Sequence, residues 1–232
     1  MDILDELVKG VEDALDEDYY KWGGVYCERK NRSLSNALTL SQPGPSLIPE
    51  VKVASPSLGV IKDLSIEECR SAASLMAKYG AGISVLTEPK RFNGSLERFE
   101  AIRSTVDCPL LMKDFIISER QLDAASDLGA DAVLIICALS EEGKGYFNLD
   151  EMISMAHQRG LETLVEAHNV VECQQAVCCD GDMIGINNRD LTTLQVDLGT
   201  TARILSGLDN EVKKPVISES GFRIRADVER YR

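Results

Sequence analysis

Charged side chains recur at the same end of successive apolar segments in this 232-residue chain. Glu50 and Lys52 lie two residues apart in the segment EVKVAS, so in a β-strand they share one face. Lys113 in PLLMKDF and Glu166 in TLVEAH repeat the pattern. Buried charges are costly unless they pair or line a wet cleft, so these side chains are candidate site residues. The same end of the later segments carries Asn187, Arg189, Glu219 and Ser220.

A structural ion pair or a solvated strand end would explain any one of these residues, but it explains their recurrence poorly. The set joins two lysines to several carboxylates and lacks the Ser/His/Asp or Cys/His combination of acyl transfer, so it favours proton transfer at a carbonyl group. Neighbouring carboxylates keep a lysine charged, whereas cations or apolar walls lower its pKa. Hydroxyl and backbone N–H groups suited to an anion such as phosphate occur in Ser55-Pro56-Ser57 and Ser220-Gly221.

Seven short apolar segments position these residues, and amphipathic helical stretches alternate with them. The segments begin near Glu50, Gly82, Pro109, Asp131, Glu162, Met183 and Pro215. Their spacing of about 27 residues suits a strand, a three-turn helix and two loops. The segment 132–136 is apolar throughout, as strands buried on both faces of a parallel sheet are. We therefore predict an α/β fold with parallel strands.

Helix boundaries agree with this period. Capping patterns predict helix starts at Ser65, Ser118 and Asn169, each followed three residues later by Glu or Gln. Glycines follow the helical stretches where a left-handed residue is favoured, at Gly80, Gly129, Gly160 and Gly181.

The position of the polar residues favours a (β/α)8 TIM barrel over an open Rossmann sheet. Catalytic groups of barrels project from the C-terminal ends of the strands, and no Gly-x-Gly-x-x-Gly follows the first strand here. Residues 1–47 lie outside the repeat, with an acidic amphipathic helix over 1–15 and a loop over 41–46. We predict an N-terminal helical extension and lead-in over residues 1–47 and a barrel over residues 48–232.

Composition argues against several classes of function. The chain has 44% hydrophobic residues, and its 25 Lys and Arg against 38 Asp and Glu give a net charge of −13, which disfavours nucleic acid as a partner. No apolar run approaches the roughly 20 residues that span a bilayer, and the acidic N-terminus is unlike a signal peptide, so we expect no membrane association and a cytoplasmic location. Seven cysteines without Cys-x-x-Cys, and the distant His157 and His168, favour reduced thiols and no metal site.

The string Glu50-Val51-Lys52-Val53-Ala54-Ser55-Pro56-Ser57 resembles the Glu-x-Lys-x-x-Ser-Pro-Ser motif of the indole-3-glycerol phosphate synthase family. Further motifs that resemble this family follow in order: ISVLTE with Phe92-Asn93-Gly94-Ser95, Lys113-Asp114-Phe115, Val165-Glu166, the stretch 185–191, and Ser218-Glu219-Ser220-Gly221. The resemblance covers residues 30 to 222 and is specific as an ordered set. It implies a phosphate-binding barrel that works in tryptophan biosynthesis.

The resemblance implies conversion of 1-(o-carboxyphenylamino)-1-deoxyribulose 5-phosphate to indole-3-glycerol phosphate, with loss of CO₂ and water and no cofactor. Lys113, held charged by Glu50, would be the general acid of ring closure. Lys52 and Glu166 would serve dehydration as acid and base, in either order. Substrate contacts are expected from three groups: Asn187, Arg189 and Glu219 on the carboxylate and hydroxyls, Phe92 and Phe115 on the aromatic ring, and Ser55, Ser220 and Gly221 on the phosphate. The small phosphorylated substrate would be the partner of a monomer.

The sequence also departs from this family. Val53 and Leu58 replace residues that are basic in many members, and Arg91 replaces an aromatic, which alters the charge at the pocket rim. Continuing the period places an eighth strand near residue 240, so we expect a natural chain about 20 to 30 residues longer. The chain as given would then bind phosphate weakly and show little activity.

Two other functions compete with the synthase. A barrel with an incomplete phosphate site could bind ligand without turnover, but the intact Lys and Glu set argues against this. An isomerase acting on a phosphoribosyl-anthranilate is a second alternative, yet such enzymes use an Asp/Cys pair rather than lysines and glutamates on strands one, three and five.

Overall fold

The computed structural model describes residues 3–24, 32–40, 45–56, 59–141, 143–191, 193–208 and 212–229. Ser57 and Leu58, both singled out in the sequence, lie outside these ranges, as does most of the loop at 41–46. No helix in the described ranges is long and apolar enough to cross a membrane.

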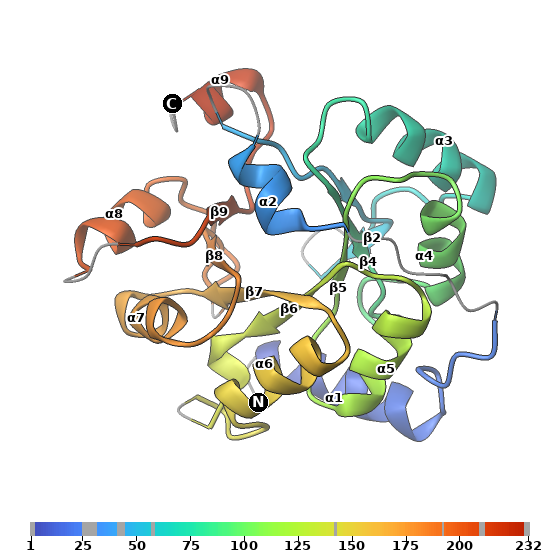
Figure 1. The fold of residues 1–232 in the computed structure, drawn as a ribbon, viewed down its shortest axis with the longest axis horizontal. Coiled ribbons are helices and arrows are strands. Elements are labelled where there is room, and N and C mark those ends of the chain that lie inside the picture. The colour runs from blue at the N-terminus through green and yellow to red at the C-terminus, as the bar shows by residue number, and fades with distance from the viewer. Residues whose placement is uncertain are drawn as a thin grey trace.

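Seven parallel strands form a curled sheet in the order β1-β4-β5-β6-β7-β8-β9 (Figure 1). Their bounds are Glu50–Val51 (β1), Ile83–Leu86 (β4), Leu110–Lys113 (β5), Ala132–Ile136 (β6), Glu162–Ala167 (β7), Met183–Asn187 (β8) and Val216–Glu219 (β9). Each begins within one residue of its predicted start, which confirms the seven-segment period. The parallel α/β class is therefore correct.

Strand register brings the polar residues to one edge of the sheet. Lys113 ends β5 beside Leu86, Glu166 lies beside Ile136 and Gly185, and Asn187 pairs with Glu219. Because the strands are parallel, all these positions belong to C-terminal strand ends, which is where a barrel carries its active site.

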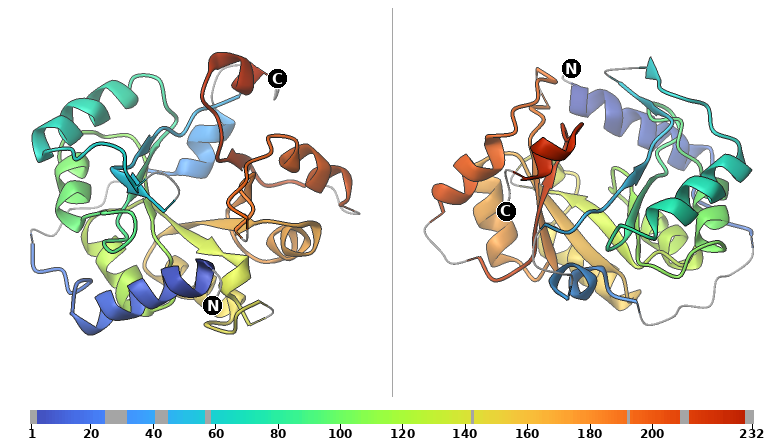
Figure 2. Two further views of the ribbon diagram at one scale, coloured as in Figure 1. Left: turned by 180° about the vertical axis from the view of Figure 1, so that it is seen from behind. Right: turned by 90° about the horizontal axis from the view of Figure 1, so that it is seen from above.

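Helices cover the outside of the sheet and one lies across each end. The outer helices are Ile66–Met76 (α3), Leu96–Arg103 (α4), Glu119–Asp127 (α5), Leu149–Gln158 (α6), Val170–Cys178 (α7), Thr200–Ser206 (α8) and Arg225–Glu229 (α9), and a 3-10 turn, Cys137–Leu139 (η1), follows β6. Figure 2 shows Ile3–Asp16 (α1) and Leu34–Thr39 (α2) at opposite ends of the strands. The Glu162 carboxylate at the start of β7 accepts the N–H groups of Leu34 and Ser35, which holds α2 at the N-terminal end.

Helix α1 covers the C-terminal end of the strands. Its buried face comprises Leu4, Leu7, Val8, Gly10, Val11 and Ala14. The two tyrosines that follow anchor it: the Tyr19 hydroxyl donates to the Thr87 carbonyl over 2.9 Å, and the Tyr20 hydroxyl lies 3.0 Å from both oxygens of Asp114. These contacts fasten the N-terminal segment beside Lys113 and were not predicted from the sequence.

The predicted helix starts are confirmed, but two of the four predicted glycine conformations are wrong. Capping boxes form at Ser65 and Ser118, and the Asn169 side chain accepts the Glu172 N–H. Gly129 and Gly160 have the expected positive φ, at 75° and 67°, whereas Gly80 and Gly181 do not. Close packing explains glycine at these two sites, because an added Cβ would lie 2.6 Å from Pro49 at Gly80 and 2.5 Å from Val165 at Gly181.

The first predicted strand is interrupted. Only Glu50–Val51 pairs with β4, and the chain then enters a small antiparallel sheet of Ala54–Ser55 (β2) and Gly59–Val60 (β3). The Val53 carbonyl accepts the N–H groups of both Ile61 and Lys62, which turns the backbone away from the main sheet. Ser55 therefore lies in a hairpin rather than in a plain loop.

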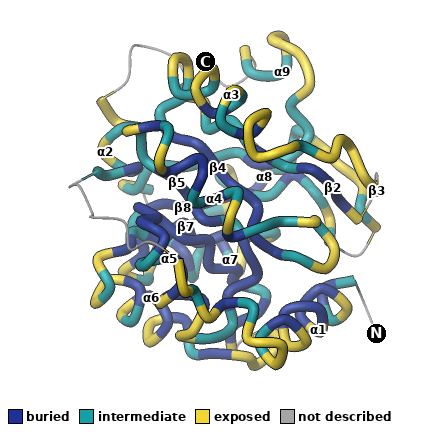
Figure 3. The backbone as a smooth tube through the Cα atoms, turned by 90° about the vertical axis from the view of Figure 1, so that its right-hand side faces the viewer, coloured by how far each residue is buried: buried dark blue, intermediate teal, exposed yellow. Residues whose placement is uncertain are grey.

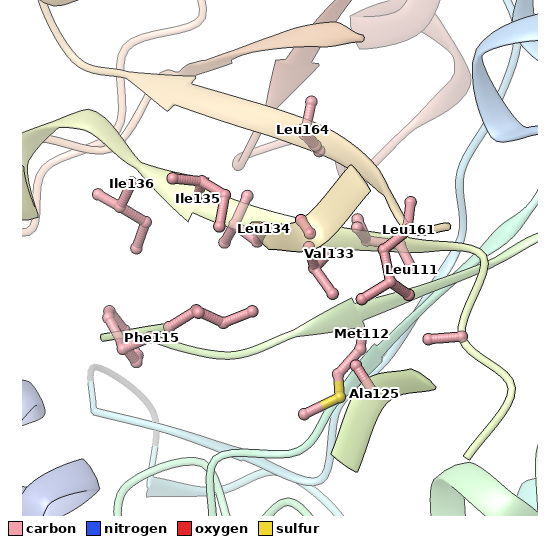
Figure 4. Packing of buried hydrophobic residues seen from close by; sticks show 14 of the residues in the cluster. Leu111, Met112, Phe115, Ala125, Val133, Leu134, Ile135, Ile136, Leu161 and Leu164 are labelled. Carbon is pink, nitrogen blue, oxygen red and sulfur yellow. The ribbon is translucent and has the colours of Figure 1, made fainter. Parts of the chain in front are cut away.

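The apolar core lies between the sheet and its outer helices and continues inside the curl of the sheet. Figure 3 shows that buried residues are concentrated in the strands, whereas exposed residues lie on the outer helices and loops. All five residues of β6 are buried, as its unbroken apolar run predicts. Figure 4 shows side chains of β5, β6 and β7, including Met112, Val133 and Leu164, packed together. This packing makes the strand ends a rigid support for a site.

Candidate active site

One pocket at the C-terminal end of the strands collects almost every predicted site residue. It is lined by Glu50, Lys52, Ser55, Phe92, Lys113, Phe115, Glu166, Asn187, Arg189, Ser220 and Gly221. Ile3 and Leu7 of α1 line it as well, so the N-terminal helix forms one of its walls. Glu219 does not line the pocket itself, but its carboxyl accepts a hydrogen bond from Lys113, which does.

Lys113 lies between two carboxylates inside the curl of the sheet. Its Nζ is 2.8 Å from Oε2 of Glu219 and 3.2 Å from Oε2 of Glu50. Burial alone would lower the pKa of Lys113, but these carboxylates raise it well above the ordinary lysine value. The ammonium is therefore charged at neutral pH and has a proton to donate.

Glu50 joins the two lysines of the site. Its Oε1 accepts from Lys52 Nζ at 2.5 Å, and its other oxygen faces Lys113. Burial would raise the pKa of Glu50, yet the two ammonium groups lower it to about 2. The predicted sharing of one face by Glu50 and Lys52 thus holds even though Lys52 lies just beyond β1.

The pKa of Glu219 is shifted in the opposite direction to that of Glu50. Burial raises the pKa of this carboxyl to about 7, although Lys113 opposes the rise, and the nearby Glu166 adds to it. Its Oε1 is buried and accepts no hydrogen bond from the described residues. An added Cβ at Gly185 would collide with this oxygen, so glycine at 185 makes room for the carboxyl.

Glu166 is held by two partners. Asn187 Nδ2 donates to its Oε1 over 3.1 Å, and His168 Nε2 lies 3.0 Å from the same oxygen. Burial would raise the pKa of Glu166, but the His168 contact lowers it below the ordinary range. Sequence reasoning weighed His168 only as a metal ligand and missed this contact. Its position two residues after Glu166 on one strand face was the available signal.

An apolar wall lies beside these charges. The rings of Phe92 and Phe115 are 5.9 Å apart between centroids, and Leu86, Leu134, Ile136 and Leu191 also line the pocket. Glu88 positions Phe92, because its buried carboxylate accepts the backbone N–H groups of Lys90, Arg91 and Phe92. This supporting role of Glu88 was also missed. The wall suits a planar aromatic ring.

Small residues form another part of the lining. Ser220 and Gly221 have positive φ values of 67° and 91°, and Ser55 contributes from the hairpin. Positive φ is uncommon for serine, and Asn188 supports it: Nδ2 donates to the Ser220 carbonyl and to Ser218 Oγ, over 3.3 and 2.9 Å. Such turns expose backbone N–H groups, and hydroxyls beside them can bind an anion.

Arg189 is partly committed to its own loop. Its Nη1 donates to the Leu194 carbonyl over 2.9 Å, and its backbone N–H donates to Asn187 Oδ1 over 3.0 Å. These bonds fix the guanidinium at the pocket rim, where a substrate carboxylate can pair with it. No group of three or more His, Cys, Asp or Glu side chains in the described ranges is arranged to hold a metal ion.

The pocket combines a half-buried proton donor, an ionised carboxylate, an apolar wall and a turn of small residues whose N–H and hydroxyl groups suit an anion. A donor and a base held on facing strands can act on a substrate whose aromatic part lies against the wall. The geometry thus suits acid–base chemistry on an anionic aromatic substrate.

Comparison with known proteins agrees with this geometry. A family model described as indole-3-glycerol phosphate synthase matches residues 9–232. Proteins of that name are similar to this chain in Methanopyrus kandleri (39% identity; 98% of this chain and 85% of the relative), Bacillus cereus strain B4264 (39%; 97% and 85%) and Rhodococcus opacus (41%; 86% and 71%). A solved structure described as "Structural study of Project ID from Aquifex aeolicus VF5" shares the fold, with TM-score 0.57, 13% identity, and 85% of this chain and 86% of that chain covered.

Proposed function

The chain belongs to the indole-3-glycerol phosphate synthase family, and we propose how its pocket performs the reaction. It is a carboxy-lyase of tryptophan biosynthesis that acts on a small phosphorylated substrate, 1-(o-carboxyphenylamino)-1-deoxyribulose 5-phosphate. The product, indole-3-glycerol phosphate, forms in three stages: ring closure, decarboxylation and dehydration. The residue roles below are our proposal.

Ring closure uses Lys113 as the general acid. The aromatic carbon that bears the carboxylate attacks the sugar carbonyl, a C–C bond forms, and the carbonyl oxygen takes a proton from Lys113 Nζ. Glu50 and Glu219 keep this ammonium charged before the transfer and stabilise its position. The single observation that carries the assignment is the place of Lys113 on the pocket wall between these two carboxylates.

The later steps use Lys52 and Glu166. Departure of CO₂ leaves its electron pair in the ring and restores aromaticity. Lys52 then protonates the departing hydroxyl and Glu166 removes the remaining proton, which forms the second double bond of the pyrrole ring. The lowered pKa of Glu166 supports this division, because an ionised carboxylate can accept a proton.

Binding contacts follow the chemistry of the pocket wall. We propose that Phe92 and Phe115 pack on the aromatic ring, that Asn187, Arg189 and Glu219 orient the carboxylate and hydroxyls, and that Ser55, Ser220 and Gly221 hold the phosphate. Nothing found in the comparisons favours a ligand-binding barrel without turnover. Fluorescence of indole product tests the activity in a chain that carries the eighth βα unit proposed below: equal amounts of indole-3-glycerol phosphate and CO₂ are expected, whereas binding without product would contradict it.

Several finer expectations remain part of the proposal. The described sheet has β1 and β9 as its outer strands, and we propose that an eighth βα unit pairs with both, since a closed barrel leaves no edge. Residues 1–47 would then be an extension, with α1 as a wall of the pocket. We further propose a cytoplasmic monomer that uses no cofactor or metal and binds no nucleic acid, the last supported by the net charge of −13.

A further inference from the structure

A histidine between two carboxylates lies beside the proposed base. His168 follows β7 directly, and its ring nitrogens face different partners: Nε2 is 3.0 Å from Oε1 of Glu166, and Nδ1 is 3.0 Å from Oε2 of Glu172. The His168 side chain is 11% exposed, and those of Glu166 and Glu172 are 4% and 18% exposed. Three titratable groups therefore form a mostly buried line from helix α7 into the pocket.

Only a doubly protonated ring presents an N–H group to each of the two carboxylates and carries the charge that pairs with both. A neutral imidazole has one N–H donor, whereas the imidazolium has one on each nitrogen. The contact with Glu166 is oblique, so it acts as an ion pair more than as an aligned hydrogen bond. The positive charge of the ring, rather than a hydrogen bond, therefore stabilises the ionised form of Glu166.

Glu172 is itself fixed. Its Oε2 also accepts the His168 backbone N–H over 2.8 Å, its Oε1 accepts from Asn169 Nδ2 over 2.6 Å, and its N–H donates to Asn169 Oδ1 over 2.9 Å. The N-terminal turn of α7 therefore does more than begin a helix, because its capping bonds hold the carboxylate that orients the His168 ring.

We propose that His168, held as an imidazolium by Glu172, is a positioning residue that keeps Glu166 ionised and ready to accept a proton in the dehydration step. This inference rests on the proposed role of Glu166 as the base. It assigns a function to two residues, His168 and Glu172, that are not among the pocket-lining side chains.

The electrostatic surroundings agree with a permanently charged ring. Burial would lower the pKa of His168, but the contacts with Glu166 and Glu172 raise it to about 10. The other titratable groups around the line are Lys113 on β5, Glu219 on β9 and the Cys137 thiol in η1. Burial raises the pKa of Cys137 above its ordinary value, so this thiol is neutral, and among these neighbours Lys113 alone adds positive charge.

Nitrogen NMR of the wild-type protein tests the charge directly, because the chain has only two histidines. With ¹⁵N-histidine labelling, His157→Gln removes one set of ring signals and so assigns the other to His168. We expect both His168 nitrogens to keep imidazolium shifts from pH 6 to about pH 9. A neutral tautomer of His168 at pH 7.5 would overturn the proposal, whatever the activity of the enzyme.

Kinetics test the consequence for Glu166. His168→Gln keeps an amide that can donate a hydrogen bond but removes the charge, and Glu172→Gln weakens the clamp on the ring. In both variants we expect the acid limb of the kcat profile to move up by roughly one pH unit, with KM within about twofold. His157→Gln, whose ring pairs with Asp182 outside the pocket, is the matched control and should leave the profile unchanged.

An equal loss of kcat at every pH, with the acid limb in place, would show that His168 is only structural. Failure of the wild-type enzyme to form indole product would instead contradict the proposed function, and the NMR result would still decide the charge state of His168.

Discussion

Nζ of Lys113 lies 2.8 Å from Oε2 of Glu219, although 106 residues separate them in the chain. The sheet places three strands, β6, β7 and β8, between the strands that carry these residues. The contact therefore crosses the inside of the curled sheet rather than running between neighbours. A carboxyl whose own pKa is raised to about 7 by burial holds the ammonium in place.

Glu219→Gln should remove the ion pair between residue 219 and Lys113. The variant removes one of the three carboxylates that raise the pKa of Lys113, so the pKa of the ammonium falls and the alkaline limb of the kcat profile moves to lower pH. We expect kcat to fall roughly ten- to a hundredfold. Steady-state fluorescence assays that extend from pH 6 to about pH 11.5 measure both effects, because the pKa of Lys113 in wild type is raised above the ordinary lysine value. If the alkaline limb of the variant is identical to that of wild type, Glu219 does not control the pKa of Lys113.

Glu166→Gln should stall the reaction after ring closure. The amide keeps the shape of the side chain but cannot accept the proton, so a species that precedes dehydration accumulates and product formation slows by roughly 10²- to 10⁴-fold. Rapid quench with separation of the products detects this species. If product forms at the normal rate and no earlier species is seen, Glu166 is not part of the mechanism.

Asp114→Asn should change how stability depends on pH. Burial raises the pKa of Asp114 to about 7, even though the Thr87 and Tyr20 hydroxyls and the Phe115 N–H donate to it. In the unfolded chain the pKa is near 3.9, so between these values the folded state binds the additional proton and stability falls as pH rises. The contribution is lost as pH rises through the folded pKa, and between pH 4 and pH 8 it amounts to about 4 kcal/mol.

Urea unfolding of wild type and Asp114→Asn at pH 5 and pH 8 measures this effect. The free energy of unfolding of the variant, relative to that of wild type, should increase as pH rises, because the amide at position 114 has no proton to lose. Asp63→Asn, an exposed position paired with Arg98, is the control for a general change of charge. A stability difference that is the same at both pH values would contradict the raised pKa.

Gly221→Ala should damage the proposed phosphate site. The backbone of Gly221 has φ of 91°, and an added Cβ would collide with Val196. The turn that follows β9 must shift, so we expect KM to rise roughly tenfold with a smaller effect on kcat. Gly23→Ala, where nothing lies within 4 Å of an added Cβ, should leave KM unchanged. An unaltered KM in Gly221→Ala would argue against phosphate binding at this turn.

The parts of the fold that the sequence could predict are those with local causes. Strand positions follow from apolar runs such as 132–136, and helix starts follow from Ser65 and Ser118, because a strand or a cap is encoded within a few residues. The Glu50–Lys52 pair was readable for the same reason, since two residues of one strand share a face.

The parts that the sequence could not predict depend on contacts between distant segments. The bond from Tyr20 to Asp114 spans 94 residues, and no periodic pattern marks it. The burial that raises the pKa of Asp114 is equally a property of the folded chain. The left-handed prediction at Gly80 was wrong because the packing of Pro49, 31 positions earlier, decides that site. The contacts of His168 are a different case: they could have been predicted and were missed, because Glu166 and Glu172 lie only two and four residues from it in the chain.

The most direct test of the mechanism is the steady-state kinetics of Lys113→Ala beside those of wild type, followed by indole fluorescence. The general-acid role predicts a loss of kcat of roughly 10²- to 10⁴-fold with KM nearly unchanged, because the ammonium is needed as charge develops on the carbonyl oxygen. Lys62→Ala, an exposed lysine paired with Glu68, should keep the wild-type rate. A Lys113→Ala enzyme that retained more than about a tenth of wild-type kcat would contradict the assignment of Lys113 as the acid.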